Sequence, residues 1–144
     1  MEKKIHNLQE LEAEAERLVA TLAPQENATL VTLSGELGAG KTSFTQALAR
    51  ALNVQDSVTS PTFVLEKIYD LPSSSSFRHL VHIDAYRLEK GTHLSALNFD
   101  SLFREKTNLI VLEWPERVAD ALPRASISLT ITALPDGERL FTYG

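Results

Sequence analysis

The chain has 144 residues, which is the size of one domain with enough apolar content for a core. Its formal net charge of −5 does not support a broad basic surface for nucleic acid, so any contact with RNA would require a partner. Because it contains no cysteine, disulfides, thiolate catalysis and cysteine-based zinc sites are excluded. We expect a single domain over residues 1–144.

The sequence contains no predicted export or membrane segment. Residues 1–25 are amphipathic and acidic, whereas a signal peptide is basic and then apolar. No apolar run approaches the length that spans a bilayer. The expected location is the cytoplasm, and the absence of cysteine is compatible with that reducing compartment.

The first predicted element is a helix between Asn7 and Pro24. Asn7 is a good N-cap residue, and Glu10 follows it by three positions. One apolar stripe at helical spacing supports the helix: Leu8, Leu11, Ala15, Leu18, Val19 and Leu22. The opposite face carries Glu10, Glu12, Glu14 and Glu16. We interpret this face as solvated surface, and the alternative is a face that docks a partner.

A glycine-rich motif separates a predicted strand from a second predicted helix. The strand is the apolar and β-branched run Ala28–Leu33, and Ser43–Leu52 has apolar residues at helical spacing. Between them, Gly35–Thr42 reads GELGAGKT and satisfies G-x-x-x-x-G-K-[ST] at every fixed position. Strand, loop and helix are the context that this motif requires.

The loop has the chemistry of a phosphate site. Glycines at positions 35, 38 and 40 let main-chain N–H groups approach phosphate oxygens closely, and the helix N-terminus adds further donors. Lys41 can reach the β- and γ-phosphates, and the Thr42 hydroxyl is a hard oxygen ligand that suits Mg²⁺. We predict a site for a nucleotide triphosphate, and the alternative is an ordinary glycine-rich turn.

A second loop is predicted to approach the same phosphates. The polar connection Asn53–Ser60 leads through Pro61 and Thr62 into a strand over Phe63–Tyr69. Pro61 favours extended geometry at Ser60. In nucleotide switches a loop at this place carries a hydroxyl to the metal or the γ-phosphate. The alternative is a plain turn with a capping hydroxyl.

The next two strands are predicted to form a hairpin. The polar loop Leu71–Ser76 separates Phe63–Tyr69 from Arg78–Asp84, and so short a link favours an antiparallel pair. If Arg78–Asp84 runs parallel to the strand before the glycine loop, then Phe63–Tyr69 runs antiparallel. The sheet is therefore expected to be mixed.

Arg78–Asp84 ends in a carboxylate at the sheet edge where ligands of open α/β sheets bind. Asp84 is expected to hold Mg²⁺ through a water or to orient the attacking water, and the alternative is a structural cap or salt bridge. His82 is interpreted as a packed core imidazole rather than a ligand. Arg87 contacts phosphate, or it pairs with Asp84 or a surface acid.

A partly helical crossover is expected between Leu88 and Lys106, with an apolar side that is interrupted near Asn98. Nothing in this segment indicates chemistry, and His93 is interpreted as a surface residue.

The segment Asn108–Trp114 reads as a buried parallel strand with a carboxylate at its end. Glu113 stands where an aspartate is commonest in phosphate-binding loop proteins, and it can reach the metal or polarise a water beside the γ-phosphate. Trp114 supplies apolar area at the mouth of the pocket, either as a lid residue or as a partner contact.

The chain is predicted to close with a short helix and a hairpin. Pro115 starts the helix Glu116–Leu122, Ser126–Thr132 alternates as a strand, and Arg139–Tyr143 returns as its partner after a turn. The expected fold is a single α/β P-loop domain with a mixed, mainly parallel sheet flanked by helices and an antiparallel hairpin at the C-terminus.

Four motifs together resemble the bacterial TsaE (YjeE) family. They are GELGAGKT at Gly35–Thr42, SPTF at Ser60–Phe63, H-x-D-x-Y-R at His82–Arg87 and LEWPE at Leu112–Glu116. They occur in the order and at the spacings of that family, and the likeness covers nearly the whole chain. One departure is Ser43, where the family often has a second threonine.

The resemblance implies a small Mg²⁺-dependent ATPase of tRNA threonylcarbamoyladenosine synthesis. Such a protein works with TsaB and TsaD, which build the threonylcarbamoyl group onto adenosine 37, and it meets tRNA only through that complex. It contributes ATP binding and hydrolysis rather than the transfer, and it is expected to be a monomer outside the complex. Turnover by the isolated protein is expected to be weak, because the chain has no unambiguous arginine finger and Arg87 is only a candidate for that role.

By position, the resemblance assigns four groups of residues. The ATP-binding residues are Gly35, Glu36, Leu37, Gly38, Ala39, Gly40, Lys41, Thr42 and Ser43. The catalytic residues are Lys41, Asp84 and Glu113, and the metal residues are Thr42 and Glu113. The switch-like or lid residues are Ser60, Pro61, Thr62, Tyr86, Arg87 and Trp114.

Three other functions are less consistent with the sequence. A GTPase would carry N-K-x-D and Asp-x-x-Gly motifs, and neither is present. A small P-loop kinase would need an acceptor pocket and an arginine-bearing lid, for which Arg117 and Arg124 are thin evidence. A nucleotide-dependent binding module with incidental hydrolysis is the remaining alternative.

Overall fold

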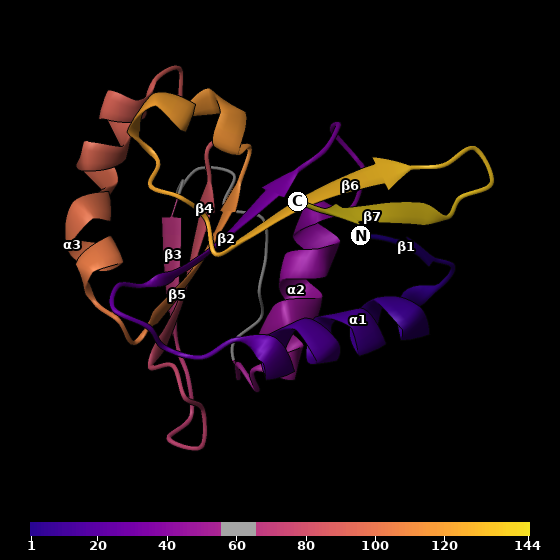
Figure 1. The fold of residues 1–144 in the computed structure, drawn as a ribbon, viewed down its shortest axis with the longest axis horizontal. Coiled ribbons are helices and arrows are strands. Elements are labelled where there is room, and N and C mark those ends of the chain that lie inside the picture. The colour runs from indigo at the N-terminus through magenta and orange to yellow at the C-terminus, as the bar shows by residue number, and fades with distance from the viewer. Residues whose placement is uncertain (56–65) are drawn as a thin grey trace.

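The computed structural model describes residues 1–55 and 66–144, which form a seven-stranded sheet with helices on both faces (Figure 1). The strands are β1 (Glu2–Ile5), β2 (Thr29–Ser34), β3 (Glu66–Asp70), β4 (His79–Asp84), β5 (Asn108–Glu113), β6 (Ile127–Ala133) and β7 (Arg139–Tyr143). The helices are α1 (Leu8–Thr21), α2 (Lys41–Ala51) and α3 (Phe99–Arg104), with 3₁₀ segments η1 (Gly91–Leu97), η2 (Pro115–Arg117) and η3 (Ala119–Ala121).

The sheet is mixed, with a parallel centre. Its strand order is β1-β7-β6-β2-β5-β4-β3; β2 runs parallel to both β5 and β6, and β4 runs parallel to β5. The pairs β1–β7, β6–β7 and β3–β4 are antiparallel. The predicted α/β fold, its internal hairpin and its C-terminal hairpin are therefore confirmed.

Alternating strand residues build one apolar core on each face of the sheet. Val31 and Val111 pack with α1 and α2 on one face, whereas Leu30 and Ile110 pack with η1 and α3 on the other. Because both faces are covered, the central strands are apolar in nearly every position. Within the part of the chain that the structure describes, no helix is long and apolar enough to cross a membrane.

Several local predictions are confirmed. The Asn7 side chain caps α1 by accepting a hydrogen bond of 2.9 Å from the N–H of Glu10. The crossover breaks at Asn98, which adopts a left-handed conformation between η1 and α3. The strand predicted over Phe63–Tyr69 is observed as β3, and residues 63–65 lie outside the described residues.

Other local predictions are wrong. The segment Glu116–Leu122 is not an α-helix but the two 3₁₀ turns η2 and η3, because Val118 leaves helical geometry where it enters the second core. β1 was not predicted, since four mainly polar residues carry little strand signal; it forms by pairing with β7. Leu8 does not belong to the buried stripe of α1 and is 66% exposed.

The interpretation of the glutamate face as solvated is wrong for Glu14, which is completely buried. Its carboxylate accepts hydrogen bonds from Arg17 of the same helix, at 2.6 and 3.1 Å, and from the Tyr143 hydroxyl of β7. The Lys3 ammonium of β1 lies 2.9 Å away. Burial alone would raise the pKa of Glu14, but these donors outweigh it and lower the pKa to about 2. The carboxylate therefore ties α1 to the β1–β7 edge.

This network predicts a pH-dependent loss of stability. Because the folded pKa of Glu14 lies below its ordinary value of 4.5, its contribution is complete above pH 4.5 and is lost as the pH falls toward 2. At pH 7 we expect Glu14→Gln to lower the free energy of unfolding by about 2 kcal/mol. This value is smaller than the full pKa shift of Glu14 implies, because solvent screens its partly exposed partners Lys3 and Arg17. Urea unfolding at pH 7, 4.5 and 3 measures the difference.

The matched control for this experiment is Glu16→Gln, at an exposed position of the same helix. Its stability should follow that of the wild type at each pH. A Glu14→Gln deficit that stays constant from pH 7 to pH 3 would contradict the assignment.

Candidate functional site

The glycine loop connects the end of β2 to the start of α2, and its backbone requires glycine at particular positions. Gly35, Gly38 and Gly40 have φ values of +151°, +82° and +112°, which side chains rarely adopt. At Gly35 a Cβ would lie 2.4 Å from the carbonyl oxygen of Ile131 in β6. The first glycine thus lets the loop leave β2 directly beside β6.

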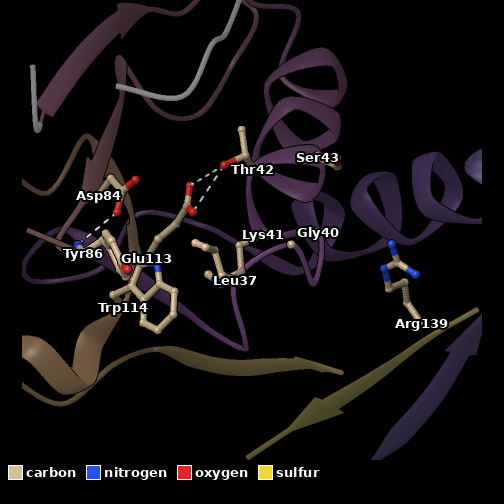
Figure 2. A pocket seen from close by; sticks show the side chains of 11 residues that line it. Leu37, Gly40, Lys41, Thr42, Ser43, Asp84, Tyr86, Glu113, Trp114 and Arg139 are labelled. Atoms are coloured by element: carbon tan, nitrogen blue, oxygen red, sulfur yellow. Dashed lines mark hydrogen bonds between the residues drawn. The ribbon is translucent and has the colours of Figure 1, made fainter. Parts of the chain in front are cut away.

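A cavity of about 290 Å³ opens beside this loop, and Figure 2 shows the side chains that surround it. It is lined by Leu37, Gly38, Gly40, Lys41, Thr42, Ser43, Asp84, Tyr86, Glu113, Trp114 and Arg139. The structure thus brings the loop together with the ends of β4 and β5, as the positions of the two acids predicted. Gly35, Glu36 and Ala39 belong to the loop but do not line the cavity.

Lys41 is buried at the base of the loop. Its ammonium donates hydrogen bonds to the carbonyl oxygens of Gly35 (2.6 Å) and Glu36 (3.0 Å), and it lies 4.1 Å from the ring centroid of Trp114. Burial lowers the pKa of Lys41, although the negative charges of Glu113 and its neighbours oppose that shift. The ammonium therefore lies close to the loop in a partly desolvated position.

Glu113 is the most deeply buried acid of the cavity, and it faces Thr42. The Thr42 hydroxyl lies 3.4 and 3.5 Å from the two carboxylate oxygens, as the dashed lines in Figure 2 mark. On the other side, His82 Nε2 lies 2.6 Å from Glu113 Oε2. His82 is fully buried, as expected of a core imidazole, but its contact with Glu113 was not predicted.

Asp84 lies beside Glu113 because the two residues are paired in the parallel register of β4 and β5. Its carboxylate accepts a hydrogen bond of 3.0 Å from the N–H of Tyr86. Burial raises the pKa of Asp84, and the nearby charge of Glu113 adds to the shift. An acid with these properties can accept a proton more readily than an exposed aspartate.

Two aromatic residues, Tyr86 and Trp114, line the cavity, and the side chain of Arg117 packs over their rings. The rings of Tyr86 and Trp114 are 4.9 Å apart, and the Arg117 guanidinium lies 5.1 and 5.9 Å from their centroids. Trp114 has a φ of +62°, and its N–H donates to the carbonyl oxygen of Leu33 in β2. Tyr86 and Trp114 both line the cavity, and their predicted role as switch-like or lid residues stays a prediction.

The structure does not test two of the predictions about the site. Arg87 is exposed and is not among the residues that line the cavity, and its predicted contact with phosphate stays a prediction. Ser60, Pro61 and Thr62 lie outside the described residues, and their predicted switch-like role stays a prediction.

Arg139 is a cavity residue that the sequence analysis missed. It is the first residue of β7, and its Nε lies 3.5 Å from the place where a Cβ on Gly40 would stand. Its guanidinium also donates to the carbonyl oxygen of Gly137 at 3.0 Å. The sequence predicted the turn before Arg139 and the strand that begins with it, but no motif indicated that the terminal hairpin lies beside the loop.

A second cavity of about 250 Å³ adjoins the first and shares Gly40, Ser43 and Arg139 with it. Its other lining residues come from the N-terminal segment and the terminal hairpin: Ile5, His6, Asn7, Leu8, Leu11, Ala39, Ile131, Gly137 and Phe141. Most of them are apolar. The sequence analysis assigned none of these residues to the site except Ala39.

The donors in the first cavity suit Mg²⁺ better than a transition metal. Thr42 and Glu113 offer hard oxygen atoms close to one another. Among residues 1–55 and 66–144, no group of three or more His, Asp or Glu residues could hold a metal.

Known proteins resemble this chain over most of its length. The family described as threonylcarbamoyl adenosine biosynthesis protein TsaE matches residues 5–141. Proteins named tRNA threonylcarbamoyladenosine biosynthesis protein TsaE are 43% identical in Streptomyces coelicolor (71% of this chain, 67% of the relative) and 36% identical in Treponema pallidum (81% and 82%). The crystal structure of Bacillus subtilis YdiB superposes with a TM-score of 0.78 at 28% identity, covering 99% of this chain and 83% of that one.

The loop geometry predicts that Gly35 is required for folding as well as for any ligand. We expect Gly35→Ala to cost about 2 to 5 kcal/mol of stability, because it combines backbone strain with overlap against β6. Gly38→Ala is the matched control, since its Cβ would meet nothing within 4 Å and only strain remains. Urea unfolding of both variants measures the difference, and equal losses would contradict this account.

Proposed function

The chain belongs to the TsaE family of threonylcarbamoyl adenosine biosynthesis proteins, and from that premise we propose that it binds and hydrolyses ATP for the machinery that modifies tRNA. One observation carries the proposal. The glycine loop, with Lys41 and Thr42, faces the buried Glu113 and the partly buried Asp84 at the ends of the neighbouring parallel strands. This is the arrangement that phosphoryl transfer to water requires.

The phosphates of ATP would lie against the loop and the N-terminus of α2. The glycine backbone presents N–H groups there without Cβ atoms in the way. Lys41 now donates to the carbonyl oxygens of Gly35 and Glu36, and it would exchange these bonds for stronger ones to the β- and γ-phosphates. Binding of the triphosphate thus competes with bonds inside the loop.

Thr42 and Glu113 would hold Mg²⁺, and Asp84 would orient the attacking water. When bound, Mg²⁺ supplies neutralisation of the charge on the β- and γ-phosphates. Glu113 is already engaged by His82 and faces Thr42, whereas Asp84 is less buried. Because burial also raises the pKa of Asp84, we assign it the proton of the attacking water.

The adenosine would occupy the second cavity. That cavity begins where the loop ends, at Gly40 and Ser43, so a nucleotide can run from one cavity into the other. Its lining includes Leu8 and Leu11 of α1 and Phe141 of β7, which offer apolar area to a base. Arg139 lies between the two cavities, next to both the phosphates and the nucleoside.

The protein would work through partners rather than by contacting RNA itself. A net charge of −5 gives little attraction for tRNA, and the family resemblance indicates TsaB and TsaD as the proteins that meet it in the cytoplasm. Arg87 does not line the cavity, and the Arg139 guanidinium beside Gly40 already donates to the carbonyl oxygen of Gly137. We therefore propose slow hydrolysis by the isolated chain and faster hydrolysis in the complex.

The proposed function predicts the following rates. The wild type should hydrolyse ATP slowly alone and at least tenfold faster with purified TsaB and TsaD. Lys41→Ala should lose most nucleotide affinity, whereas Glu113→Ala should still bind ATP but lose hydrolysis by about a hundredfold. Phosphate release with and without the partners measures these rates.

Lys90→Ala is the matched control for Lys41→Ala, because Lys90 is exposed and does not line the cavity. Absence of stimulation by the partners would rule out the family role and leave the nucleotide site intact. Normal tRNA modification with Glu113→Ala would indicate a nucleotide-dependent binding module instead.

The nucleoside position predicts a selective loss of affinity in Leu8→Ala. Leu8 is exposed, so its truncation should leave the fold intact while it removes apolar contact with the base. We expect ATP to bind 3- to 10-fold more weakly, at about 1 kcal/mol, and tripolyphosphate to bind unchanged. Ile68→Ala is the control, since Ile68 is also exposed but lies on β3 at the other edge of the sheet. Calorimetry with both ligands tests this, and an equal loss for the two would contradict it.

A further inference from the structure

We infer that His82 is a positioning residue for Glu113, and that it orients this carboxylate toward Thr42 for the metal. The inference rests on the proposed function, because it concerns the proposed Mg²⁺ site, but it adds a residue to which no catalytic, metal or ATP-binding role was assigned. It starts from a short contact between two buried polar side chains: His82 Nε2 and Glu113 Oε2 are 2.6 Å apart, with side chains that are 0% and 3% exposed.

The sheet register explains how the two side chains meet. β4 and β5 are neighbouring parallel strands in which Asp84 pairs with Glu113 and His82 pairs with Val111. His82 and Asp84 are two residues apart, so both point to the face that α2 covers. The imidazole therefore lies one step deeper in the sheet than Asp84, from where it reaches back to the Glu113 carboxylate.

The direction of the hydrogen bond follows from the chemistry of the acceptor. An ionised carboxylate can only accept, so the hydrogen lies on His82 Nε2. Among residues 1–55 and 66–144, the other ring nitrogen, Nδ1, is buried and has no hydrogen-bond partner. Within that part of the chain, Glu113 is therefore the group that satisfies the buried imidazole.

The contact with His82 restricts the orientation of the Glu113 carboxylate that faces Thr42. A glutamate has three rotatable bonds, and Glu113 must keep its oxygens toward Thr42, whose hydroxyl is 3.4 and 3.5 Å from them. With Oε2 held by His82, the carboxylate has a fixed orientation before any metal binds. Donors of this kind behind metal ligands commonly contribute 10- to 100-fold in metal affinity.

The test compares variants that differ in where they can place a donor. His82→Gln puts an amide N–H near the position of Nε2, His82→Asn has too short a side chain to reach it, and His82→Leu has no donor. The readout is the gain in affinity for a non-hydrolysable ATP analogue when Mg²⁺ replaces EDTA, measured by calorimetry. Thermal unfolding of each variant reports on the fold.

We expect His82→Leu and His82→Asn to reduce the Mg²⁺-dependent gain by 10- to 100-fold while affinity in EDTA stays within about twofold of the wild type. His82→Gln should restore the gain to within about threefold. His79→Gln, on the same strand but away from the cavity, is the control and should match the wild type. If His82→Leu and His82→Asn fail to fold, His82→Gln alone tests the inference. A folded His82→Gln variant that loses the Mg²⁺-dependent gain in affinity overturns the inference.

Failure of this inference can be told apart from failure of the proposed function. If the wild type gains affinity with Mg²⁺, Glu113→Ala loses that gain and His82→Leu keeps it, then His82 has only a structural role and the metal site remains. If the wild type itself shows no gain, the proposed metal site is wrong and the role of His82 falls with it.

Discussion

The parallel alignment of β2, β4 and β5 is the constraint on which the rest of the molecule depends. Because these strands run in one direction, their carboxyl ends meet at one edge, and the glycine loop leaves from the same edge. The strand register sets which residues are neighbours at this edge, because Leu33 pairs with Glu113 and Glu113 pairs with Asp84. Thr42 and Glu113 are 71 positions apart in the chain, yet their side chains face each other across one cavity.

Burial gives these side chains their chemistry. Three side chains are almost inaccessible to water: Lys41, His82 and Glu113. The Lys41 ammonium donates to the carbonyl oxygen of Gly35, and the His82 imidazole contacts the Glu113 carboxylate. Such groups are costly to bury, so a site made of them is preorganised at some expense of stability. Away from the cavity, Glu14 contributes stability to the fold, because its buried carboxylate holds α1 against β1 and β7. That same edge forms one wall of the second cavity.

Much of the fold could be predicted, because its signals are local. Apolar runs predicted the strands β2, β4 and β5. The side chain of Asn7 caps α1, as its residue type predicted. The failures share one physical cause, which is that neighbours remote in sequence override local pattern. The mainly polar segment Glu2–Ile5 forms β1 only because β7 lies beside it, and Glu14 is buried only because Tyr143 and Lys3 contact it.

The sequence by itself determined the glycine loop and predicted its phosphate chemistry, since GELGAGKT states its backbone and side-chain requirements in eight adjacent residues, and it placed Asp84 and Glu113 at strand ends. Only the tertiary structure decided which groups accompany them. The contact of His82 with Glu113 depends on strand register, and the position of Arg139 beside Gly40 depends on β6 packing parallel to β2. Register and packing are relations between distant segments, and no local pattern of residues encodes them.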